Sequence, residues 1–284
     1  MSNGDPTFAI IGAAGYITPK HLDAIHHVGG RVLGACDTHD AVGVLDRYDD
    51  LPSFFTEIER FDRWLDRQNR GPQPVDYVVV CTPNYLHDPH ARLAMRAGSD
   101  VIVEKPVCLT ERNLDSLLGI EEETGKRVNC ILQLRNATVP DLQRDGTDSI
   151  VVRYSVRRGV WYDYSWKGNL ARSGGVLTNI GIHLIDLLCF FFARGDEPPR
   201  FNVLVQKPRG LMGDLHLGEG IYASVDLRVR YRGPVQRTLL VSEHKVDLSA
   251  GMDFHNVEYE NIVAGDGWSL ETARDAIRVC ERSR

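Results

Sequence analysis

Two segments combine ionisable side chains in patterns that suit proton transfer. The sequence VEKPV places Glu104 and Lys105 directly after an apolar run. Further along, Asn179, His183 and Asp186 are spaced by four and three residues in an otherwise apolar segment, so a helix puts them on one face. Such a polar stripe is costly unless it faces a site, and a lysine with a lowered pKa can take a proton from a hydroxyl. We therefore predict an alcohol-oxidising centre with Lys105 and His183 as the catalytic pair.

Each of these residues also has a structural explanation. Lys105 could form a surface ion pair with Glu104, and His183 could be a core histidine whose hydrogen bonds are satisfied. Pro106 allows an unusual peptide geometry in the turn. A metal ion is disfavoured, because Asn179 is a poor ligand and no further cluster of acids and histidines is evident in the sequence. We predict no metal.

A turn near the N-terminus has the layout of a dinucleotide site. Gly12 follows the first predicted strand and begins the sequence GAAGYI, just before a predicted helix. Small residues there let backbone amides approach a pyrophosphate at the helix N-terminus. The match to GxGxxG is imperfect, because Ala14 and Ile17 stand at the second and third glycine positions, and a Gly-Ala turn after a strand is common in other proteins. The turn, with Gly15 and Tyr16, is a candidate cofactor site.

Two further loops favour NAD. Asp37 ends the second predicted strand, where an acid accepts hydrogen bonds from ribose hydroxyls and repels the phosphate of NADP. The loop CTPNYLH follows another apolar strand, and the carboxyl ends of such strands face the ligand. As alternatives, Asp37 could be a turn residue, and Asn84 could cap the next helix. The predicted NAD contacts are Gly12, Ala14, Gly15, Tyr16, Ile17, Asp37, Thr82, Pro83, Asn84, His87, Glu104 and Lys105.

The elements that position these residues follow from hydrophobic patterning. In the first half, continuous β-branched runs alternate with helical patterns, which predicts a parallel sheet covered on both faces. The predicted strands are 8–11, 32–36, 75–81, 101–103 and 128–132, and the predicted helices are 19–28, 57–68, 86–97 and 111–124. Right-handed crossovers make a doubly wound Rossmann sheet the default arrangement.

The pattern changes after about Leu134. Alternating strands are predicted at 150–158, 201–206, 221–229 and 235–243, with helices at 176–192 and 269–281. Successive alternating strands indicate a large, mostly antiparallel open sheet. We therefore predict an α/β protein with a dinucleotide-binding domain at 1–134 and a substrate-binding and oligomerisation domain at 135–284. A cleft between the two is the expected ligand site.

Composition excludes several classes of function. The net charge of −6 over 284 residues disfavours a general nucleic-acid binder. The longest apolar run, around 184–193, contains Asp186 and suits a core helix better than a membrane span. No secretion signal is evident, and the six cysteines form no CxxC pair or zinc-ligand spacing. A cytoplasmic protein without nucleic-acid or membrane partners is expected.

Taken together, these segments resemble a known family. GAAGYI, CTPNYLH, EKPV and the segment SGGVLTNIGIHLID are similar to the Gfo/Idh/MocA oxidoreductases, which include glucose-fructose oxidoreductase and inositol dehydrogenases. The resemblance implies a Rossmann domain followed by an α/β domain whose open sheet often forms dimers or tetramers. It also implies an NAD-dependent enzyme acting on a CH–OH group, with Lys105 and His183 at the substrate carbon beside the nicotinamide.

A narrower resemblance is carried by SFFTEIERFDRWLD, ILQLR, RRGVWY and SWKG. These look like the WlbA and WbpB group of UDP-N-acetylglucosaminuronate 3-dehydrogenases of surface-polysaccharide synthesis, which oxidise the sugar 3-hydroxyl; some members recycle NADH with 2-oxoglutarate. Many family members have an Asp where this chain has Asn179, and because an Asn cannot act as a base, proton transfer shifts to Lys105 and His183. After Arg135 the group usually has a histidine-containing segment and a longer helix, whereas this chain reads NATVPDLQRDGTDS.

The segment from 153 to 175 favours an anionic substrate. It contains Arg153, Arg157, Arg158, Lys167 and Arg172, opposed only by Asp163, with Trp161, Tyr162, Tyr164 and Trp166 among them. Charge-assisted hydrogen bonds suit a diphosphate and a carboxylate, while the rings could stack on uracil or simply bury the loop. The predicted substrate contacts are Lys105, Arg135, Arg158, Trp161, Tyr162, Lys167, Asn179 and His183.

We therefore expect NAD-dependent oxidation of the 3-hydroxyl of a UDP-linked aminosugar acid by a homodimer or homotetramer. Two other enzymes remain as alternatives: a dehydrogenase of another sugar or inositol, and an NAD-dependent glycosidase with no net redox change. A non-catalytic NAD sensor is disfavoured, because it would have no chemical need for both Lys105 and His183.

Overall fold

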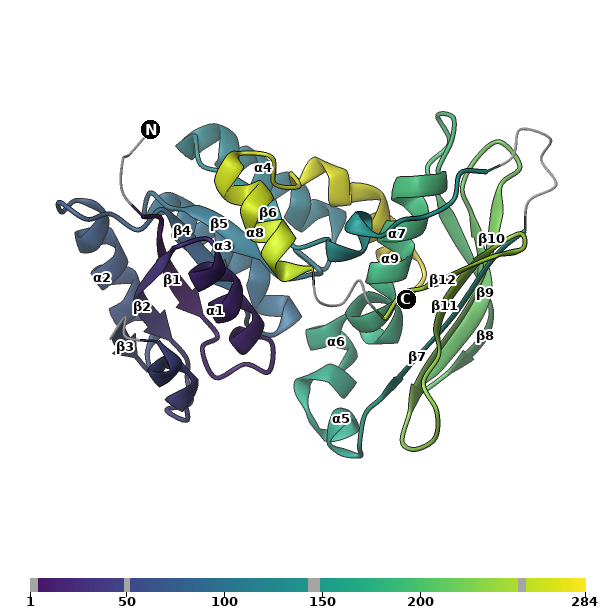
Figure 1. Ribbon diagram of the computed structural model, residues 1–284, viewed down its shortest axis with the longest axis horizontal. Helices are drawn as coiled ribbons and strands as arrows, with labels where there is room; N and C mark the ends of the chain where they lie inside the picture. Colours follow the sequence, from purple (N-terminus) through teal and green to yellow (C-terminus); the bar gives the residue numbers. More distant parts are fainter. Residues whose placement is uncertain (1–4, 49–51, 143–148, 250–253) are drawn as a thin grey trace. The chain divides into compact units, whose positions relative to one another are not determined.

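The computed structural model describes residues 5–48, 52–142, 149–249 and 254–284. The chain forms two compact units, each with its own sheet (Figure 1). Unit 1 comprises Met1–Cys108, Arg112–Ile131 and His255–Thr272, and unit 2 comprises Leu109–Glu111, Leu132–Phe254 and Ala273–Arg284.

Unit 1 is built on a parallel sheet with the strand order β3-β2-β1-β4-β5-β6. The strands are β1 Thr7–Ile11, β2 Arg31–Cys36, β3 Ser53–Phe55, β4 Tyr77–Val80, β5 Asp100–Val103 and β6 Val128–Cys130. Val78, Val79 and Val80 are all fully buried, as expected for a sheet covered on both faces. The strand order reverses between β1 and β4, which confirms the predicted doubly wound sheet.

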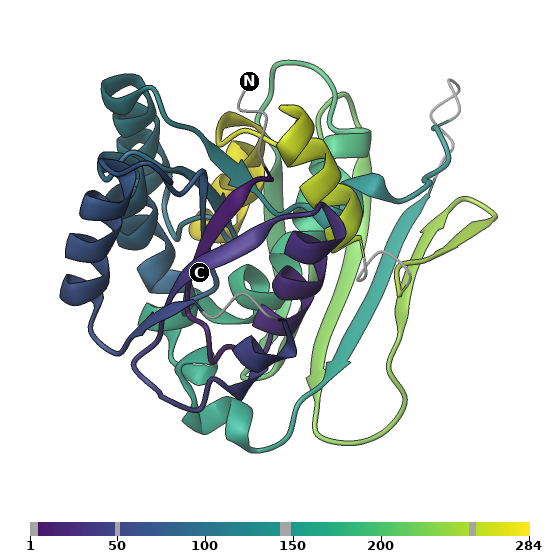
Figure 2. The same cartoon turned by 60° about the vertical axis from the view of Figure 1, so that its left-hand side comes forward.

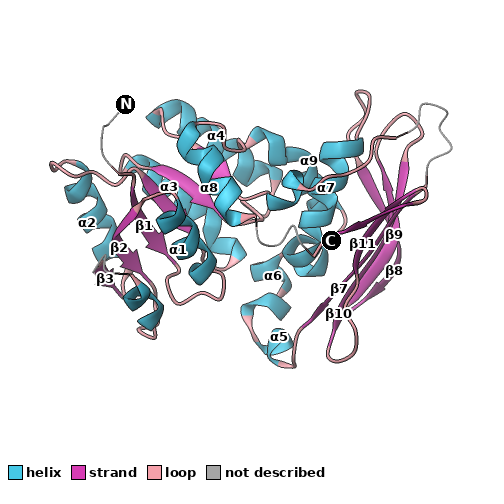
Figure 3. Ribbon diagram, viewed as in Figure 1, coloured by secondary structure: helices cyan, strands magenta, loops and turns pink. Residues whose placement is uncertain are grey.

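Four helices connect these strands and cover the sheet (Figure 3). They are α1 Thr18–His27, α2 Ile58–Asn69, α3 His87–Arg96 and α4 Glu111–Thr124. Each lies within two residues of its predicted range, because its apolar positions recur at helical spacing. The three-residue edge strand β3 was not predicted, since it is too short for a pattern to emerge.

A later helix, α8 (His255–Ala264), also belongs to unit 1 and packs alongside α1 (Figure 2). Its Tyr259 and Ile262 are buried in the same core cluster as Phe8 and Ile25. The two contiguous domains of the sequence analysis placed this segment with residues 135–284. The structure groups it with unit 1, because its apolar side chains complete that core.

Unit 2 contains a second sheet with the strand order β12-β11-β7-β10-β9-β8. The strands are β7 Ile150–Arg157, β8 Arg200–Lys207, β9 Gly210–His216, β10 Tyr222–Arg230, β11 Arg237–Val241 and β12 His244–Asp247. β7 and β10 are parallel and the other neighbours antiparallel, which confirms the predicted sheet type. Strands β9 and β12 were not predicted.

The helices of unit 2 are α5 Trp161–Tyr164, α6 Leu170–Ser173, α7 Ile182–Phe192 and α9 Arg274–Arg282. The segment Leu177–Gly181, just before α7, is a π-helix. Within the described chain, the stretch Leu170–Phe192 is long and apolar enough to span a membrane, with a mean hydropathy of 1.8. This apolar stretch is longer than the sequence analysis expected. Because 72% of its most apolar 18-residue window is buried inside the protein, the stretch is typical of a core helix.

The chain after Arg135 was predicted to lack a longer helix. Residues Gln133–Asn136 form a single 3₁₀ turn, and 137–142 continue without regular structure. The rest of that prediction, at 143–148, lies outside the described residues.

Candidate active site

The glycine-containing turn of unit 1 is shaped by Gly12. Its φ is +97°, and a Cβ there would lie 2.7 Å from the Cys81 carbonyl carbon. The Gly12 amide donates to the Cys36 carbonyl oxygen at 2.8 Å, and the Thr18 hydroxyl donates to the Gly12 carbonyl at 2.8 Å. The turn therefore accommodates only glycine at this position.

The turn presents backbone donors beside an acid, as a dinucleotide site requires. In the described part of the chain, the amides of Tyr16 and Ile17 donate no hydrogen bond, and both precede α1. Asp37 follows β2, and its carboxylate accepts the amides of Ala14 and His39, each at 2.9 Å. Asp37 is thus a turn residue, which was the alternative explanation considered above, and its carboxylate is also bonded to the glycine turn. These residues fit NAD: donors for a pyrophosphate at a helix N-terminus, and an acid near the ribose position.

Replacing Gly12 by alanine should weaken NAD binding at least about tenfold, because a strained φ and a steric clash typically cost about 1–3 kcal/mol. Isothermal titration with NAD measures the effect. Gly43→Ala is the matched control, since no atom lies within 4 Å of a Cβ at Gly43. Equal affinities of the two variants for NAD would contradict this account of the turn.

The loop after β4 brings four of the predicted cofactor residues together. Asn84 is buried and opens the 3₁₀ turn Asn84–Leu86; the N-cap of α3 is Leu86, so Asn84 does not cap that helix. His87 is buried, and its ring nitrogens lie 2.6 Å from the Thr82 carbonyl oxygen and 2.7 Å from the Pro106 carbonyl oxygen. Burial lowers the pKa of His87, although both carbonyls favour the protonated ring. His87 therefore links two loops of unit 1.

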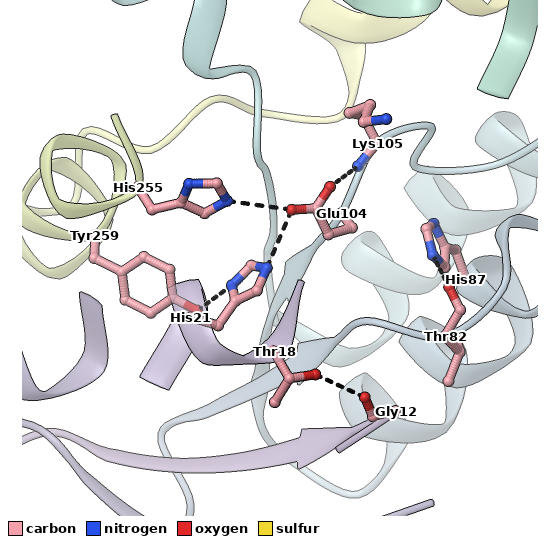
Figure 4. Close-up of polar contacts among 9 residues, drawn as sticks. All are labelled: Gly12, Thr18, His21, Thr82, His87, Glu104, Lys105, His255 and Tyr259. Carbon is pink, nitrogen blue, oxygen red and sulfur yellow. Dashed lines mark hydrogen bonds and ion pairs between the residues drawn. The ribbon is translucent and has the colours of Figure 1, made fainter. Parts of the chain in front are cut away.

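The turn after β5 contains the predicted base. Lys105 is half-buried, and the Lys105–Pro106 peptide is cis. The carboxylate of Glu104 is bonded to His21 and His255, instead of forming the surface ion pair with Lys105 considered above (Figure 4). Neither histidine was predicted from the sequence as a site residue.

In unit 2, two of the three residues of the predicted polar stripe have separate hydrogen-bond partners. Asn179, His183 and Asp186 are 6%, 7% and 3% exposed. Asn179 lies in the π-helix and donates to the Tyr162 hydroxyl at 3.1 Å. Asp186 accepts two hydrogen bonds from Arg135, at 2.6 and 2.9 Å. A π-helix is often found at a functional site, because it redirects side chains relative to an α-helix.

Arg135 was predicted to contact the substrate. In the structure its guanidinium is buried, is bonded to Asp186 and lies 4.7 Å from the centre of the Phe190 ring. Burial raises the pKa of Asp186, and the bonds from Arg135 oppose that rise. This pairing favours a structural role for Arg135 inside unit 2, and its predicted contact with the substrate stays a prediction.

The cationic and aromatic segment contains both exposed and buried rings. Trp161 is 50% exposed, whereas Tyr162 is 2% exposed and belongs to the core. Lys167 lies 4.0 Å from the centre of the Trp166 ring. Arg158 is half-buried, and its backbone carbonyl accepts a bond from Arg209 at 2.8 Å.

Arg209 is a member of this group that the sequence analysis missed. It forms an ion pair with Asp163 at 3.1 Å and lies 3.5 Å from the centre of the Tyr231 ring. Arg209 comes from the turn between β8 and β9, so no local spacing connects it with the segment at 153–175.

Comparison with known proteins identifies relatives over most of the chain. The Gfo/Idh/MocA oxidoreductase family model for the NAD-binding Rossmann fold matches residues 7–131, and the model for the C-terminal alpha/beta domain matches 149–199. The WlbA (WbpB) dehydrogenase of Thermus thermophilus is 34% identical, with 97% of this chain and 94% of that chain covered. Its complex with NAD and alpha-ketoglutarate superposes with a TM-score of 0.88, and its complex with NAD and UDP-GlcNAcA with 0.87.

Curated relatives are more distant and more varied. The 1,5-anhydro-D-fructose reductase of Ensifer adhaerens is 26% identical over 77% of this chain and 65% of its own length. A glycosyl hydrolase family 109 protein of Shewanella amazonensis is 31% identical over 48% of this chain and 30% of its own length. The chain thus spans about two thirds or less of these curated relatives. The family matches confirm the predicted NAD-binding fold.

Proposed function

Because the chain belongs to the Gfo/Idh/MocA oxidoreductase family and its first unit has that family's NAD-binding Rossmann fold, we propose that it is an NAD-dependent nucleotide-sugar dehydrogenase. The substrate that we infer is UDP-N-acetylglucosaminuronate, oxidised at its 3-hydroxyl to the 3-keto sugar in surface-polysaccharide synthesis. The observation that carries this proposal is the 34% identity, over 97% of the chain, to a dehydrogenase whose structure contains NAD and UDP-GlcNAcA.

Three residues are assigned to the reacting hydroxyl. Lys105 acts as the general base and takes the hydroxyl proton. His183 donates or relays a proton at the same hydroxyl, and Asn179 orients the sugar, because an amide cannot act as a base. NAD, when bound, accepts the hydride. The position of Lys105 directly after β5 supports its role, since ligands bind at the carboxyl ends of parallel strands.

The cationic segment of unit 2 is assigned to the anionic groups of the substrate. Arg158 and Lys167 would bind the diphosphate or the carboxylate through charge-assisted hydrogen bonds. Trp161 is the ring that we assign to base stacking, because half of it is exposed. Tyr162 contributes through its bond to Asn179 of the π-helix, and Arg135 supports α7 through Asp186.

Two further properties belong to the proposal: recycling of NADH and an oligomeric state. Recycling of NADH by 2-oxoglutarate is supported by the Thermus thermophilus complex with NAD and alpha-ketoglutarate. A homodimer or homotetramer formed through the unit 2 sheet is supported by its exposed apolar side chains, since such side chains often mark an interface. These are Leu204, Val205, Met212 and Tyr222, at 61%, 42%, 42% and 57% exposure.

A glycosidase is the second candidate. It is favoured by the 31% identity to the glycosyl hydrolase family 109 protein, although that match covers only 48% of this chain. In such an enzyme the alcohol would be oxidised only transiently, so sugar would be released without accumulation of NADH.

The deciding experiment mixes the purified protein with NAD and UDP-N-acetylglucosaminuronate, with and without 2-oxoglutarate, and follows the NADH absorbance band. We expect a rise in absorbance, or 2-hydroxyglutarate when 2-oxoglutarate is present. A signal only with inositol or free sugars would keep the dehydrogenase and reject the nucleotide sugar. Sugar release without NADH would establish the glycosidase.

A further inference from the structure

Four buried polar side chains of unit 1 form a cluster next to Lys105, and no catalytic step has been assigned to any of them. They are His21 of α1, Glu104 of the turn after β5, and His255 and Tyr259 of α8, with exposures of 0%, 7%, 3% and 0%. Figure 4 shows the two imidazoles and the phenol on one side of Glu104, and Lys105 on the other. Buried polar groups are costly unless they are hydrogen-bonded, so their bonds indicate what this cluster does.

The bonds of the cluster converge on one carboxylate. Oε1 of Glu104 lies 3.1 Å from Nε2 of His21 and 3.4 Å from Nε2 of His255, and Oε2 accepts the backbone amide of Lys105 at 3.2 Å. Nδ1 of His21 lies 2.8 Å from the Tyr259 hydroxyl. If that hydroxyl donates to Nδ1, the His21 proton is on Nε2 and is donated to the carboxylate.

Glu104 is held in its ionised form. Burial opposes its ionisation, yet hydrogen bonds from His21 and His255 hold the pKa of Glu104 well below its ordinary value. Burial lowers the pKa of His21, so this ring is a neutral donor. Burial also raises the pKa of Cys81 and of Tyr259, which face Glu104 as neutral groups. A fixed negative charge therefore lies next to the Lys105 peptide.

The turn is also held on its far side. The carbonyl oxygen of Pro106 is bonded to the buried ring of His87 at 2.7 Å. Lys105 consequently lies between two anchored neighbours, Glu104 before it and Pro106 after it. Its backbone is fixed while its side chain extends from the turn.

We propose that His21, His255 and Tyr259 are positioning residues, which hold Glu104 in place and thereby fix the peptide from which the Lys105 amine reaches the substrate hydroxyl. With one imidazole removed, the carboxylate would be free to rotate and the turn to shift. A misplacement of about 1 Å at a reacting group costs about 10²-fold in rate. This inference rests on the proposed role of Lys105 as the base.

The cluster also has donor atoms of the kind that bind zinc. One ligand atom each from His21, Glu104 and His255 lies within 4.8 Å of the others, a grouping that the sequence analysis did not foresee. Both ring nitrogens, however, are within hydrogen-bonding distance of the same carboxylate oxygen. Direct hydrogen bonds therefore account for the arrangement, and the metal content of the protein is measured as part of the test.

The test compares three variants of the cluster with a matched control. Glu104→Ala removes the carboxylate, Glu104→Gln keeps an acceptor for the Lys105 amide, and His255→Phe keeps a ring without a donor. Glu258→Gln is the control, because Glu258 is a fully buried acid on the same helix that is bonded to the Trp268 indole at 3.3 Å.

We expect kcat to fall about 100-fold in Glu104→Ala and about tenfold in both Glu104→Gln and His255→Phe. KM should stay within about threefold in all three variants. NAD affinity should stay within about threefold in His255→Phe, which alters no predicted NAD contact, and Glu258→Gln should keep its kcat, since only the position of the base changes. The partial activity of Glu104→Gln relative to Glu104→Ala separates positioning from general damage to the fold. If Glu104→Ala does not fold, the kcat values of Glu104→Gln and His255→Phe test the proposal.

The outcomes separate this inference from the proposed function. Unchanged kcat in the Glu104 and His255 variants, with Lys105→Met inactive, would overturn the positioning role alone. An active Lys105→Met would overturn the role of Lys105 as base. One equivalent of bound metal, whose removal reproduces the loss, would overturn the hydrogen-bonded account.

A second measurement needs no substrate, so it tests the positioning role even if the proposed substrate is wrong. Acetic anhydride labelling, read by mass spectrometry, compares the Lys105 amine with that of Lys126. In His255→Phe the ratio should rise at least about threefold, because a turn that is no longer held in place gives the reagent easier access to the Lys105 amine. An unchanged ratio would overturn the inference.

Discussion

Replacing Lys105 by methionine should lower kcat by about 10²–10⁴-fold, the range for loss of a general base. Methionine retains an unbranched apolar side chain and removes the amine. The turn should keep its shape, because Glu104 is bonded to His21, to His255 and to the backbone amide at position 105, not to the lysine amine. NAD affinity should therefore stay near that of the unmodified protein. Oxidation of UDP-N-acetylglucosaminuronate, followed at the NADH band, and NAD titration together measure the effect.

Lys126→Met is the matched control for this prediction. Lys126 is a half-buried lysine of unit 1 in the turn after α4, outside the predicted NAD contacts. The control should turn over at the normal rate. If Lys105→Met kept more than about a tenth of that rate, general-base catalysis by Lys105 would be excluded.

The Rossmann half was predictable because its sheet is buried on both faces. A strand in such a sheet reads as a continuous apolar run, as in VDYVVVC, so the strand is visible without any knowledge of its neighbours. Strand β9 lacks that signal. It reads GLMGDLH, and Gly213 has no room for a side chain, since a Cβ there would lie 2.3 Å from the Asn202 carbonyl oxygen. The close approach of β8 determines this residue, and local patterning does not show it.

The elements that carry the candidate site residues could be predicted from the sequence, whereas the hydrogen-bond partners of those residues could not. Strand ends and helix faces indicated where Asp37, Lys105 and His183 would be, because these follow from local periodicity. The partner of Glu104 could not be found in this way. His255 is 151 residues from Glu104, and Tyr259 is 238 residues from His21. A buried polar residue indicates that a partner exists, but only the tertiary fold shows which residue it is.

Replacing Asp186 by alanine should destabilise the protein by about 3–5 kcal/mol, because it leaves the buried charge of Arg135 without its bidentate partner. Both side chains are at most 4% exposed, so water cannot replace the lost carboxylate without entering the core. Chemical denaturation measures the free energy of unfolding, and the unfolding of unit 2 should dominate the loss.

The pair also tests whether Arg135 binds the substrate. If its role is structural, Arg135→Met should lower stability while a folded fraction keeps a KM close to normal. Combining Arg135→Met with Asp186→Leu should then recover much of the loss, since a buried ion pair can often be replaced by apolar side chains of similar volume. A substrate contact predicts a different result: Arg135→Met would raise KM strongly, and the double variant would recover stability without recovering KM. A loss below about 1 kcal/mol in Asp186→Ala would instead mean that the pair is solvated, and the structural role of Arg135 would have to be abandoned.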